Sequence, residues 1–282
     1  MKVIHFPAEM KAWARDQTVA GKSIGLVPTM GSFHQGHLSL MRLAAGRTDT
    51  VVVSLYVNPG QFGPGEDFTD YPRDFARDCQ LAAAEKVDVI FAPTDQDMYP
   101  RGFQTSVSVK QLSEKLCGAS RPGHFDGVAT VVTKLFHLCG ADCAVFGEKD
   151  FQQLAVIRRL VADLDLDVAV IGHPIVREAD GLAMSSRNSY LDDRERRTAL
   201  CLYESLLMAR DEAAAGLLDT DRLGRRIEDH ILSYPGTEID YVAFVDPLTL
   251  EPVDNIDSGT LLALAVKING RVRLIDNCLV LT

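Results

Sequence analysis

The sequence PTMGSFHQGHLSLMRLAA, residues 28–45, narrows the folds that this chain can adopt. It overlaps an apolar run, SIGLVPT at residues 23–29, and it ends in a segment whose apolar residues recur at helical spacing. Glycines allow a tight turn between the two, and His34 and His37 stand on either side of the second glycine. A strand that turns through glycines into a helix places backbone N–H groups and the positive helix end at one edge of a sheet, where phosphates bind.

The alternation of apolar strand and amphipathic helix continues through the first part of the chain. Further strand candidates lie at residues 50–57, 87–93, 142–147 and 167–172. Helix candidates lie at residues 37–47, 73–86, 127–140 and 151–164. Apolar strands that alternate with helices indicate a parallel sheet covered on both faces. We therefore predict an α/β fold, a Rossmann-like doubly wound parallel sheet, over residues 1–175.

The pattern changes in the last third of the chain. Helical patterns at residues 191–214 and 221–232 come first, and strand candidates follow at residues 238–247, 260–268 and 272–281. Helices followed by strands that turn-rich segments separate are typical of an α+β unit with an antiparallel sheet. We predict that residues 176–282 form a second, smaller α+β domain.

Length and cysteine content indicate a protein that folds without covalent or metal cross-links. A chain of 282 residues buries about 75% of its unfolded surface, which is enough for a sizeable core. None of the six cysteines belongs to a CxxC pair, and we expect them to be reduced core thiols. A zinc site made of His137, Cys139 and Cys143 is the weaker alternative, because no second ligand pair stands at zinc-finger spacing.

Charge and hydropathy exclude two classes of partner. The net charge is −10, so no basic face is available to follow a nucleic-acid backbone. No stretch approaches the ~18 consecutive apolar residues of a membrane span, and the N-terminal segment lacks the apolar core of a signal peptide. We expect a cytoplasmic protein with neither nucleic-acid nor membrane partners.

Two other polar clusters follow the histidine motif along the chain, and the first begins at the end of a strand candidate. FGEKDFQQL, residues 146–154, places Lys149 at the carboxyl edge of the sheet, although a solvated charged turn with Asp150 as helix cap is an equal alternative. ADGLAMSSRNSYL, residues 179–191, offers two serines and Arg187, which can bind a triphosphate, although Ser185 or Ser186 as a helix cap is a fair alternative. Together with the histidine motif, the clusters predict a nucleotide site.

Several longer blocks make the sequence similar to a known family. PTMGxxHxGH with a later MSSR resembles the HIGH and KMSKS signatures of class I aminoacyl-tRNA synthetases and nucleotidylyltransferases. Together with VNPxQF, YPR, RPGHFDGV and GEKDxQQL, this pattern, from residue 23 to 191, resembles the pantothenate synthetases. The resemblance implies an AMP-forming ligase of coenzyme A biosynthesis. Such a ligase uses ATP and Mg²⁺ to convert (R)-pantoate into a pantoyl adenylate, then joins it to β-alanine, and it acts as a homodimer.

The resemblance also implies roles for individual residues. The ATP-binding residues would be Met30, Gly31, Ser32, Phe33, His34, Gln35, Gly36, His37, Gly147, Glu148, Lys149, Asp150, Val176, Met184, Ser185, Ser186 and Arg187. The catalytic residues would be His34, His37, Lys149 and Arg187, with a proton-donor role usually assigned to His37. Pantoate and β-alanine would contact Asn58, Gln61, Arg121, His124 and Gln153. Asp78 would contribute to the magnesium environment.

One departure from the family concerns the pantoate pocket. The family usually has methionine before the glutamine of VNPxQF, where this chain has Gly60, and we expect the change to remove an apolar wall beside pantoate.

The adenylate is a mixed anhydride that water hydrolyses. We therefore expect the C-terminal domain to act as a lid that carries residues 184–187 onto ATP.

Three other functions are alternatives to the ligase. A nucleotidylyltransferase would share the histidine motif but would leave AMP on its product, whereas Gln61 and Gln153 suit a small hydroxy acid. A tRNA synthetase is disfavoured because this acidic chain contains no obvious tRNA-binding domain. A non-catalytic nucleotide sensor would bind ATP without turnover.

Overall fold

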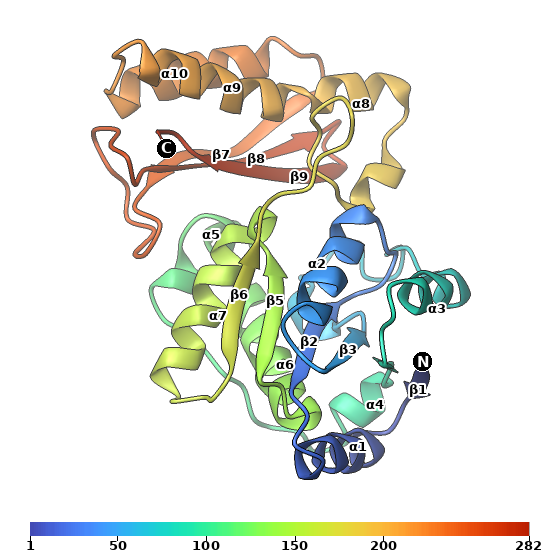
Figure 1. Cartoon of the computed structure of the whole chain (residues 1–282). Helices are drawn as coiled ribbons and strands as arrows, with labels where there is room; N and C mark the ends of the chain where they lie inside the picture. Colours follow the sequence, from blue (N-terminus) through green and yellow to red (C-terminus); the bar gives the residue numbers. More distant parts are fainter. Residues whose placement is uncertain (282) are drawn as a thin grey trace.

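The alternation of strands and helices produces a six-stranded sheet in the first part of the chain (Figure 1). The structure is a computed structural model that describes residues 1–281. The strands are β1 (Lys2–Ile4), β2 (Ile24–Thr29), β3 (Thr50–Leu55), β4 (Val89–Phe91), β5 (Cys143–Gly147) and β6 (Ala169–His173). They lie in the order β1-β4-β3-β2-β5-β6, and every neighbouring pair is parallel. The prediction of a doubly wound α/β fold is confirmed.

Helices cover both faces of this sheet. They are α1 (Pro7–Val19), α2 (Gln35–Ala45), α3 (Phe75–Ala84), α4 (Asp95–Met98), α5 (Cys117–Ser120), α6 (His124–Cys139) and α7 (Phe151–Asp163). Helices α1, α6 and α7 pack on one face, while α2 and α3 pack on the other. Successive strand residues alternate between the two cores, so that Leu26 belongs to the first and Val27 to the second. Burial on both faces explains why these strands are apolar throughout.

The strand order reverses at β2, which has β3 and β4 on one side and β5 and β6 on the other. Open α/β sheets bind ligands at the carboxyl ends of the strands at such a reversal. Strand β2 leads into the histidine motif, and β5 leads into the 3₁₀ helix η3 (Glu148–Asp150). Two of the predicted polar clusters therefore follow the two strands that meet at the reversal.

The last third of the chain forms the predicted α+β unit, which lies above the carboxyl ends of the parallel strands in Figure 1. Helices α8 (Asp193–Ala199), α9 (Cys201–Ala214) and α10 (Thr220–Leu232) accompany the antiparallel strands β7 (Thr237–Val245), β8 (Leu261–Ile268) and β9 (Val272–Leu279). On the central strand, Leu262 and Leu264 pack with the helices, whereas Leu261 and Ala263 pack with the core of the first unit. The sheet is thus covered on both faces. A domain boundary at residues 175/176 stays a prediction.

The sequence pattern missed strand β1, helix α1 and the four-residue helices α4 and α5. Strand β1 has three residues, and α1 buries only Met10 and Ala14, so neither produces a clear periodicity. All six cysteines are free thiols, as expected. Across residues 1–281, no helix has the length and apolar character needed to cross a membrane.

Candidate active site

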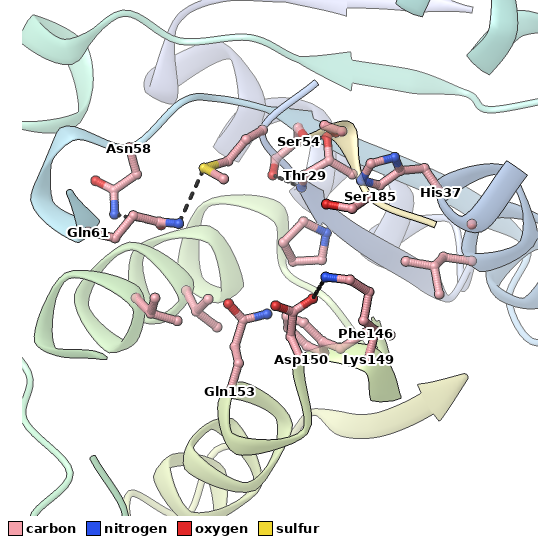
Figure 2. A pocket seen from close by; sticks show the side chains of 18 of the residues that line it. Thr29, His37, Ser54, Asn58, Gln61, Phe146, Lys149, Asp150, Gln153 and Ser185 are labelled. Carbon is pink, nitrogen blue, oxygen red and sulfur yellow. Dashed lines mark hydrogen bonds and ion pairs between the residues drawn. The ribbon is translucent and has the colours of Figure 1, made fainter. Parts of the chain in front are cut away.

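A cavity of about 240 Å³ lies at the carboxyl ends of β2, β3 and β5. His34 and His37 line it from the histidine motif, Lys149 lines it from the segment after β5, and Arg187 lines it from the second unit. Figure 2 shows the side chains of this cavity, among them His37, Lys149 and Ser185. The three clusters that the sequence singled out therefore meet in one place.

The two histidines of the motif form the N-terminal cap of α2. The Nδ1 atom of His34 accepts a hydrogen bond from the Gly36 N–H at 3.1 Å, and the Nδ1 atom of His37 accepts one from the His34 N–H at 3.4 Å. The ring centroids are 4.1 Å apart. Because Nδ1 is an acceptor in both rings, each neutral imidazole carries its proton on Nε2. Both rings thus keep one N–H donor for a ligand in the cavity.

The environment keeps both of these imidazoles neutral. Burial, reinforced by the Lys149 ammonium, lowers the pKa of His34 to about 4. Burial lowers the pKa of His37 well below its usual value as well, with smaller contributions from His34 and Lys149. At neutral pH the pair therefore offers hydrogen-bond donors without net charge, and the positive charge at this end of the cavity comes from Lys149.

Lys149 belongs to the short helix η3, and both units of the protein hold it in place. Its Nζ atom lies 3.7 Å from Oδ2 of Asp150, and Figure 2 marks this pair with a dashed line. From strand β9, the Asn277 side chain donates hydrogen bonds to the carbonyl oxygens of Glu148 at 3.0 Å and Lys149 at 2.9 Å. The second unit therefore fixes the backbone that presents the ammonium group.

Gln61 and Gln153 approach the cavity from different walls (Figure 2). The Nδ2 group of Asn58 donates to the carbonyl oxygen of Gly127 at 3.1 Å and to Oε1 of Gln61 at 3.1 Å. A carbonyl only accepts hydrogen bonds, so it sets the orientation of the Asn58 amide and, through it, that of Gln61. The Nε2 group of Gln61 then faces the cavity, where it contacts the sulfur of Met30 at 3.2 Å. Gln61 is thereby set to donate to an oxygen of a ligand.

Two guanidinium groups at the other end of the cavity are paired with carboxylates. Arg187 donates to Asp67 from Nε at 3.0 Å and from Nη2 at 2.8 Å. Arg121 donates to Glu66 from Nε and Nη2, both at 2.6 Å. Both carboxylates belong to the segment of residues 62–74, which connects the short helix after β3 to helix α3. In this structure the arginines already hold anions that the protein itself supplies.

His124 lies beside Arg121 and has the opposite tautomer to the histidine pair. Its Nδ1 donates to the carbonyl oxygen of Gln61 at 2.7 Å, and its Nε2 accepts from Nη1 of Arg121 at 3.2 Å. Burial, followed by the nearby guanidinium, lowers the pKa of His124 to about 4. This imidazole is therefore also neutral at pH 7, and both of its nitrogens are used within the protein.

Comparison with known proteins places the chain in a family. The family model described as pantoate–β-alanine ligase matches residues 2–279. The chain belongs to the pantoate–β-alanine ligase family. It is 57% identical to the pantothenate synthetase of Geobacter sulfurreducens over 278 residues, which cover 99% of this chain and 98% of the relative. It is 55% identical to the pantothenate synthetase of Heliobacterium modesticaldum over 280 residues, which cover 99% of each chain.

Solved ligase structures match the whole fold. The crystal structure of pantothenate synthetase from Thermus thermophilus superimposes with a TM-score of 0.94 at 44% identity, and the match covers 100% of both chains. The ligase from Francisella tularensis, solved in complex with βγ-ATP and β-alanine, gives a TM-score of 0.82 at 33% identity and covers 99% of this chain and 98% of that one. The two-unit architecture is therefore that of the ligase family.

Most residues that the family resemblance implied for the ligase site do line the cavity. These are Met30, His34, Gly36, His37, Asn58, Gln61, Arg121, His124, Gly147, Lys149, Asp150, Gln153, Val176, Met184, Ser185, Ser186 and Arg187. Gly31, Ser32, Phe33, Gln35 and Glu148 lie in the same segments but do not line it. Phe33 is a core residue with 1% of its surface exposed. The individual roles of all these residues stay predictions.

Asp78 is engaged in holding the histidine loop. Its two carboxylate oxygens accept hydrogen bonds from the N–H groups of Ser32 and Phe33, both at 2.8 Å, and the residue is 1% exposed. Ser32 has a φ of 55°, and these bonds stabilise that left-handed turn. Asp78 does not line the cavity, and its contribution to a magnesium environment stays a prediction.

Gly60 lies next to Asn58, Tyr99 and Gly127 in the structure. It does not line the cavity, and a Cβ atom there would lie 3.4 Å from Oδ1 of Asn58 and 3.7 Å from both the Tyr99 hydroxyl and Cα of Gly127. A side chain at this position would begin toward those groups. The expectation that Gly60 removes a wall beside pantoate stays a prediction.

Sequence reasoning missed several residues that shape the ligase site. Glu66 and Asp67 bind the two arginines, and Asn277 holds the backbone of Lys149. Tyr71 lines the cavity, and the YPR block that contains it was the available signal. The other three residues stand in no motif that marks them.

Proposed function

We propose that this cavity catalyses the ATP-dependent, AMP-forming condensation of (R)-pantoate with β-alanine to pantothenate through a pantoyl adenylate. The observation that carries the proposal is the meeting of His34, His37, Lys149 and Arg187 in one cavity whose walls also hold paired glutamines. That set combines anion-binding groups for a triphosphate with amide groups for a small hydroxy acid. Membership of the ligase family supports the same reaction.

In the first half-reaction, a carboxylate oxygen of pantoate would attack the α-phosphorus of ATP. The bond from that phosphorus to the bridging oxygen breaks, and pyrophosphate leaves. Lys149 and Arg187 would neutralise phosphate charge, and the Nε2–H groups of His34 and His37 would donate to phosphate oxygens. A placed donor of this kind contributes ~3–4 kcal/mol, and alignment of the two reactants contributes up to ~7–11 kcal/mol.

We propose that Mg²⁺ enters with ATP and is held mainly by the phosphates. Within residues 1–281, no three His, Cys, Asp or Glu side chains are grouped so that they hold a metal by themselves. Proteins commonly bind Mg²⁺ through substrate phosphates with one or two carboxylates, and Asp150 is a carboxylate that lines the cavity. When bound, the ion would reduce the negative charge on the triphosphate.

In the second half-reaction, the nitrogen of β-alanine would attack the acyl carbon of the adenylate. The bond from that carbon to the phosphate oxygen breaks, AMP leaves, and the nitrogen loses a proton. The second unit would limit access of water during this step. Its Ser186 hydroxyl already donates to the carbonyl oxygen of Ser32 at 3.2 Å, so residues 184–187 rest against the histidine loop.

From the family resemblance we also propose a homodimer and a cytoplasmic location. Light scattering of the purified protein tests the first, with a mass near 62 kDa (twice 30.9 kDa) expected for a dimer.

The function is tested by incubating the protein with ATP, Mg²⁺, pantoate and β-alanine and omitting each in turn. We expect pyrophosphate release and ATP–pyrophosphate exchange that depend on pantoate but not on β-alanine. AMP release and pantothenate should require all four components. ATP binding without turnover would instead support the sensor, and AMP that stays attached to the final product would support a nucleotidylyltransferase.

A further inference from the structure

A side chain outside the active-site cavity holds the amide that orients Gln61. The hydroxyl of Tyr99 donates to Oδ1 of Asn58 at 2.7 Å, although the two residues are 41 positions apart in the sequence. Tyr99 directly follows helix α4, and it does not line the active-site cavity. Its hydroxyl can therefore act on a substrate only through Asn58.

The amide of Asn58 uses all of its hydrogen-bonding capacity within the protein. Asn58 is buried, with 1% of its surface exposed. Its Oδ1 atom accepts hydrogen bonds from the Tyr99 hydroxyl and from the Gly60 N–H, the latter at 3.3 Å. Its Nδ2 group donates to the carbonyl oxygen of Gly127 and to Oε1 of Gln61, both at 3.1 Å. A primary amide has two donor hydrogens and two acceptor lone pairs, so none is left over.

The backbone partners fix the direction of this chain of hydrogen bonds. The Gly60 N–H only donates and the Gly127 carbonyl only accepts, so the Asn58 amide has one allowed orientation. Since Oδ1 is an acceptor, the Tyr99 hydroxyl is the donor in their hydrogen bond. Burial, followed by the charge of Asp95, raises the pKa of Tyr99 to about 12, so the hydroxyl keeps its proton at neutral pH.

Neighbouring side chains hold the Tyr99 ring and thereby aim its hydroxyl. The Phe103 ring meets the Tyr99 ring edge-on, with the centroids 5.1 Å apart. The Lys134 ammonium lies 5.6 Å from the Tyr99 centroid and 4.7 Å from the Phe103 centroid. Lys134 and Gly127 both belong to helix α6. Helix α6 thus anchors the Nδ2 end of the Asn58 amide directly, and it contacts the ring whose hydroxyl anchors the Oδ1 end.

The orientation of the Asn58 amide decides which end of the Gln61 amide faces a ligand. Figure 2 shows the two side chains together at one wall of the cavity. Because Nδ2 of Asn58 donates to Oε1 of Gln61, the Nε2 group of Gln61 is the end that is free to donate. When Asn58 is not held, Gln61 can turn and present its carbonyl oxygen, which donates no hydrogen bond to an oxygen of the substrate.

We propose that Tyr99 is a positioning residue for pantoate binding, whose hydroxyl fixes the Asn58 amide so that Gln61 donates to the substrate. The proposal rests on the proposed function and extends the acid-binding wall to a residue that touches no substrate. The hydroxyl acts through Asn58 and Gln61 alone, so its loss should weaken the binding of pantoate and leave the binding of ATP unchanged.

Tyr99→Phe is the direct test, because it removes only the hydroxyl and keeps the ring against Phe103. In ATP–pyrophosphate exchange, we expect kcat/KM for pantoate to fall by about threefold to tenfold, the range for one lost hydrogen bond. The KM for ATP should stay within about twofold of the wild-type value. The matched control is Tyr203→Phe, which removes a hydroxyl from helix α9, outside the active-site cavity, and should change neither measurement.

A double-mutant cycle separates positioning from a general effect on packing. In the Asn58→Ala background the hydroxyl has lost the group on which it acts, so the addition of Tyr99→Phe should change kcat/KM for pantoate by less than about twofold. Measurement at low pantoate concentration gives kcat/KM even for variants that do not saturate. Urea unfolding of each variant establishes that the compared proteins are folded.

The outcomes distinguish this proposal from the proposed function. A loss that is selective for pantoate and disappears in the Asn58→Ala background supports the positioning role. An unchanged kcat/KM for pantoate in Tyr99→Phe, or an equal loss in both backgrounds, would overturn that role and leave the proposed function intact. Absence of pantoate-dependent exchange in the wild-type protein would overturn the proposed function, and this proposal with it.

Discussion

The two ends of the active-site cavity differ in how closely their cationic groups are paired with carboxylates of the protein. At the histidine–lysine end, the imidazoles are neutral donors, and Lys149 lies at a loose 3.7 Å from Asp150. At the arginine end, Arg187 and Arg121 are each held by two hydrogen bonds to a carboxylate, at 2.6–3.0 Å. The first end can accept phosphate as it stands. The second must exchange a protein carboxylate for a substrate anion, so substrate binding there is coupled to the segment of residues 62–74.

The largest effect should come from the end that is ready for phosphate. Lys149→Ala removes the unneutralised charge of that end, and we expect pantoate-dependent ATP–pyrophosphate exchange to fall by about 10²–10³. Thermal unfolding should change little, because the ammonium makes no short ion pair. Lys110→Ala, which removes an exposed lysine that does not line the active-site cavity, is the control. A larger loss of exchange in Arg187→Ala than in Lys149→Ala would contradict the comparison.

The pH dependence of stability should show that both ends contain neutral imidazoles. The pKa values of His34 and His124 are about 4 in the folded protein, against ~6.5 in an unfolded chain. Between these values the unfolded chain binds protons that the native protein does not, so stability falls as the pH falls from about 6.5 toward 4. For each histidine we expect the free energy of unfolding to drop by roughly 2 kcal/mol between pH 7 and pH 5.

Urea unfolding at the two pH values measures this drop in the wild type and in two variants. His34→Asn keeps a helix cap, and His124→Gln keeps a hydrogen-bonding side chain. Each variant should lose its share of the pH dependence, and the carboxylates common to all three proteins cancel in the comparison. A variant with the same pH dependence as the wild type would show that its imidazole is not held neutral by the fold.

A smaller effect should appear when the carboxylate of the arginine end is removed. Asp67→Asn weakens the pair with Arg187, so ATP no longer has to displace an anion, and we expect the KM for ATP to fall by about threefold to tenfold. Asp70→Asn changes an exposed residue of the same segment and is the matched control. An increased KM for ATP in Asp67→Asn would show that Asp67 positions Arg187 for phosphate instead of competing with it.

The fold could be predicted from the sequence wherever burial produces a simple pattern of apolar residues. Strands β2 to β6 are apolar runs because helices cover both faces of their sheet, and the helices that carry a clear apolar stripe were found. The antiparallel sheet was also found, although its central strand reads as continuously apolar because both units cover it. Strand β1 and helix α1 were missed because they contribute few buried residues.

Site residues that directly follow a strand could be predicted from the sequence. Site residues that depend on packing between distant segments were harder to predict. The histidine motif and Lys149 follow the two strands at the reversal of the sheet, which locates them from sequence alone. Glu66 and Asp67 read as solvated acids of a turn, and only the fold brings them to arginines more than fifty positions away. Asn277 reaches Lys149 from the other unit, and no local pattern encodes that contact.

The smallest effect should come from Gly60, which directly precedes Gln61 in the sequence. Its φ is not in the left-handed region, and a Cβ atom there meets its nearest neighbour at an ordinary 3.4 Å. Gly60→Ala should therefore stabilise the protein by about 0.4–1 kcal/mol, because alanine leaves the unfolded chain fewer conformations than glycine does, and the KM for pantoate should change by less than about twofold.

Gly127→Ala is the contrasting variant, because its Cβ atom would lie 1.9 Å from the carbonyl oxygen of Gly60. That clash pushes residues 58–61 away from Gly127 and weakens the Asn58 hydrogen bond to its carbonyl oxygen, so pantoate binding should weaken in Gly127→Ala but not in Gly60→Ala. A raised KM for pantoate in Gly60→Ala would instead show that this position does face the substrate, and that the glutamine wall is less fixed than its hydrogen bonds indicate.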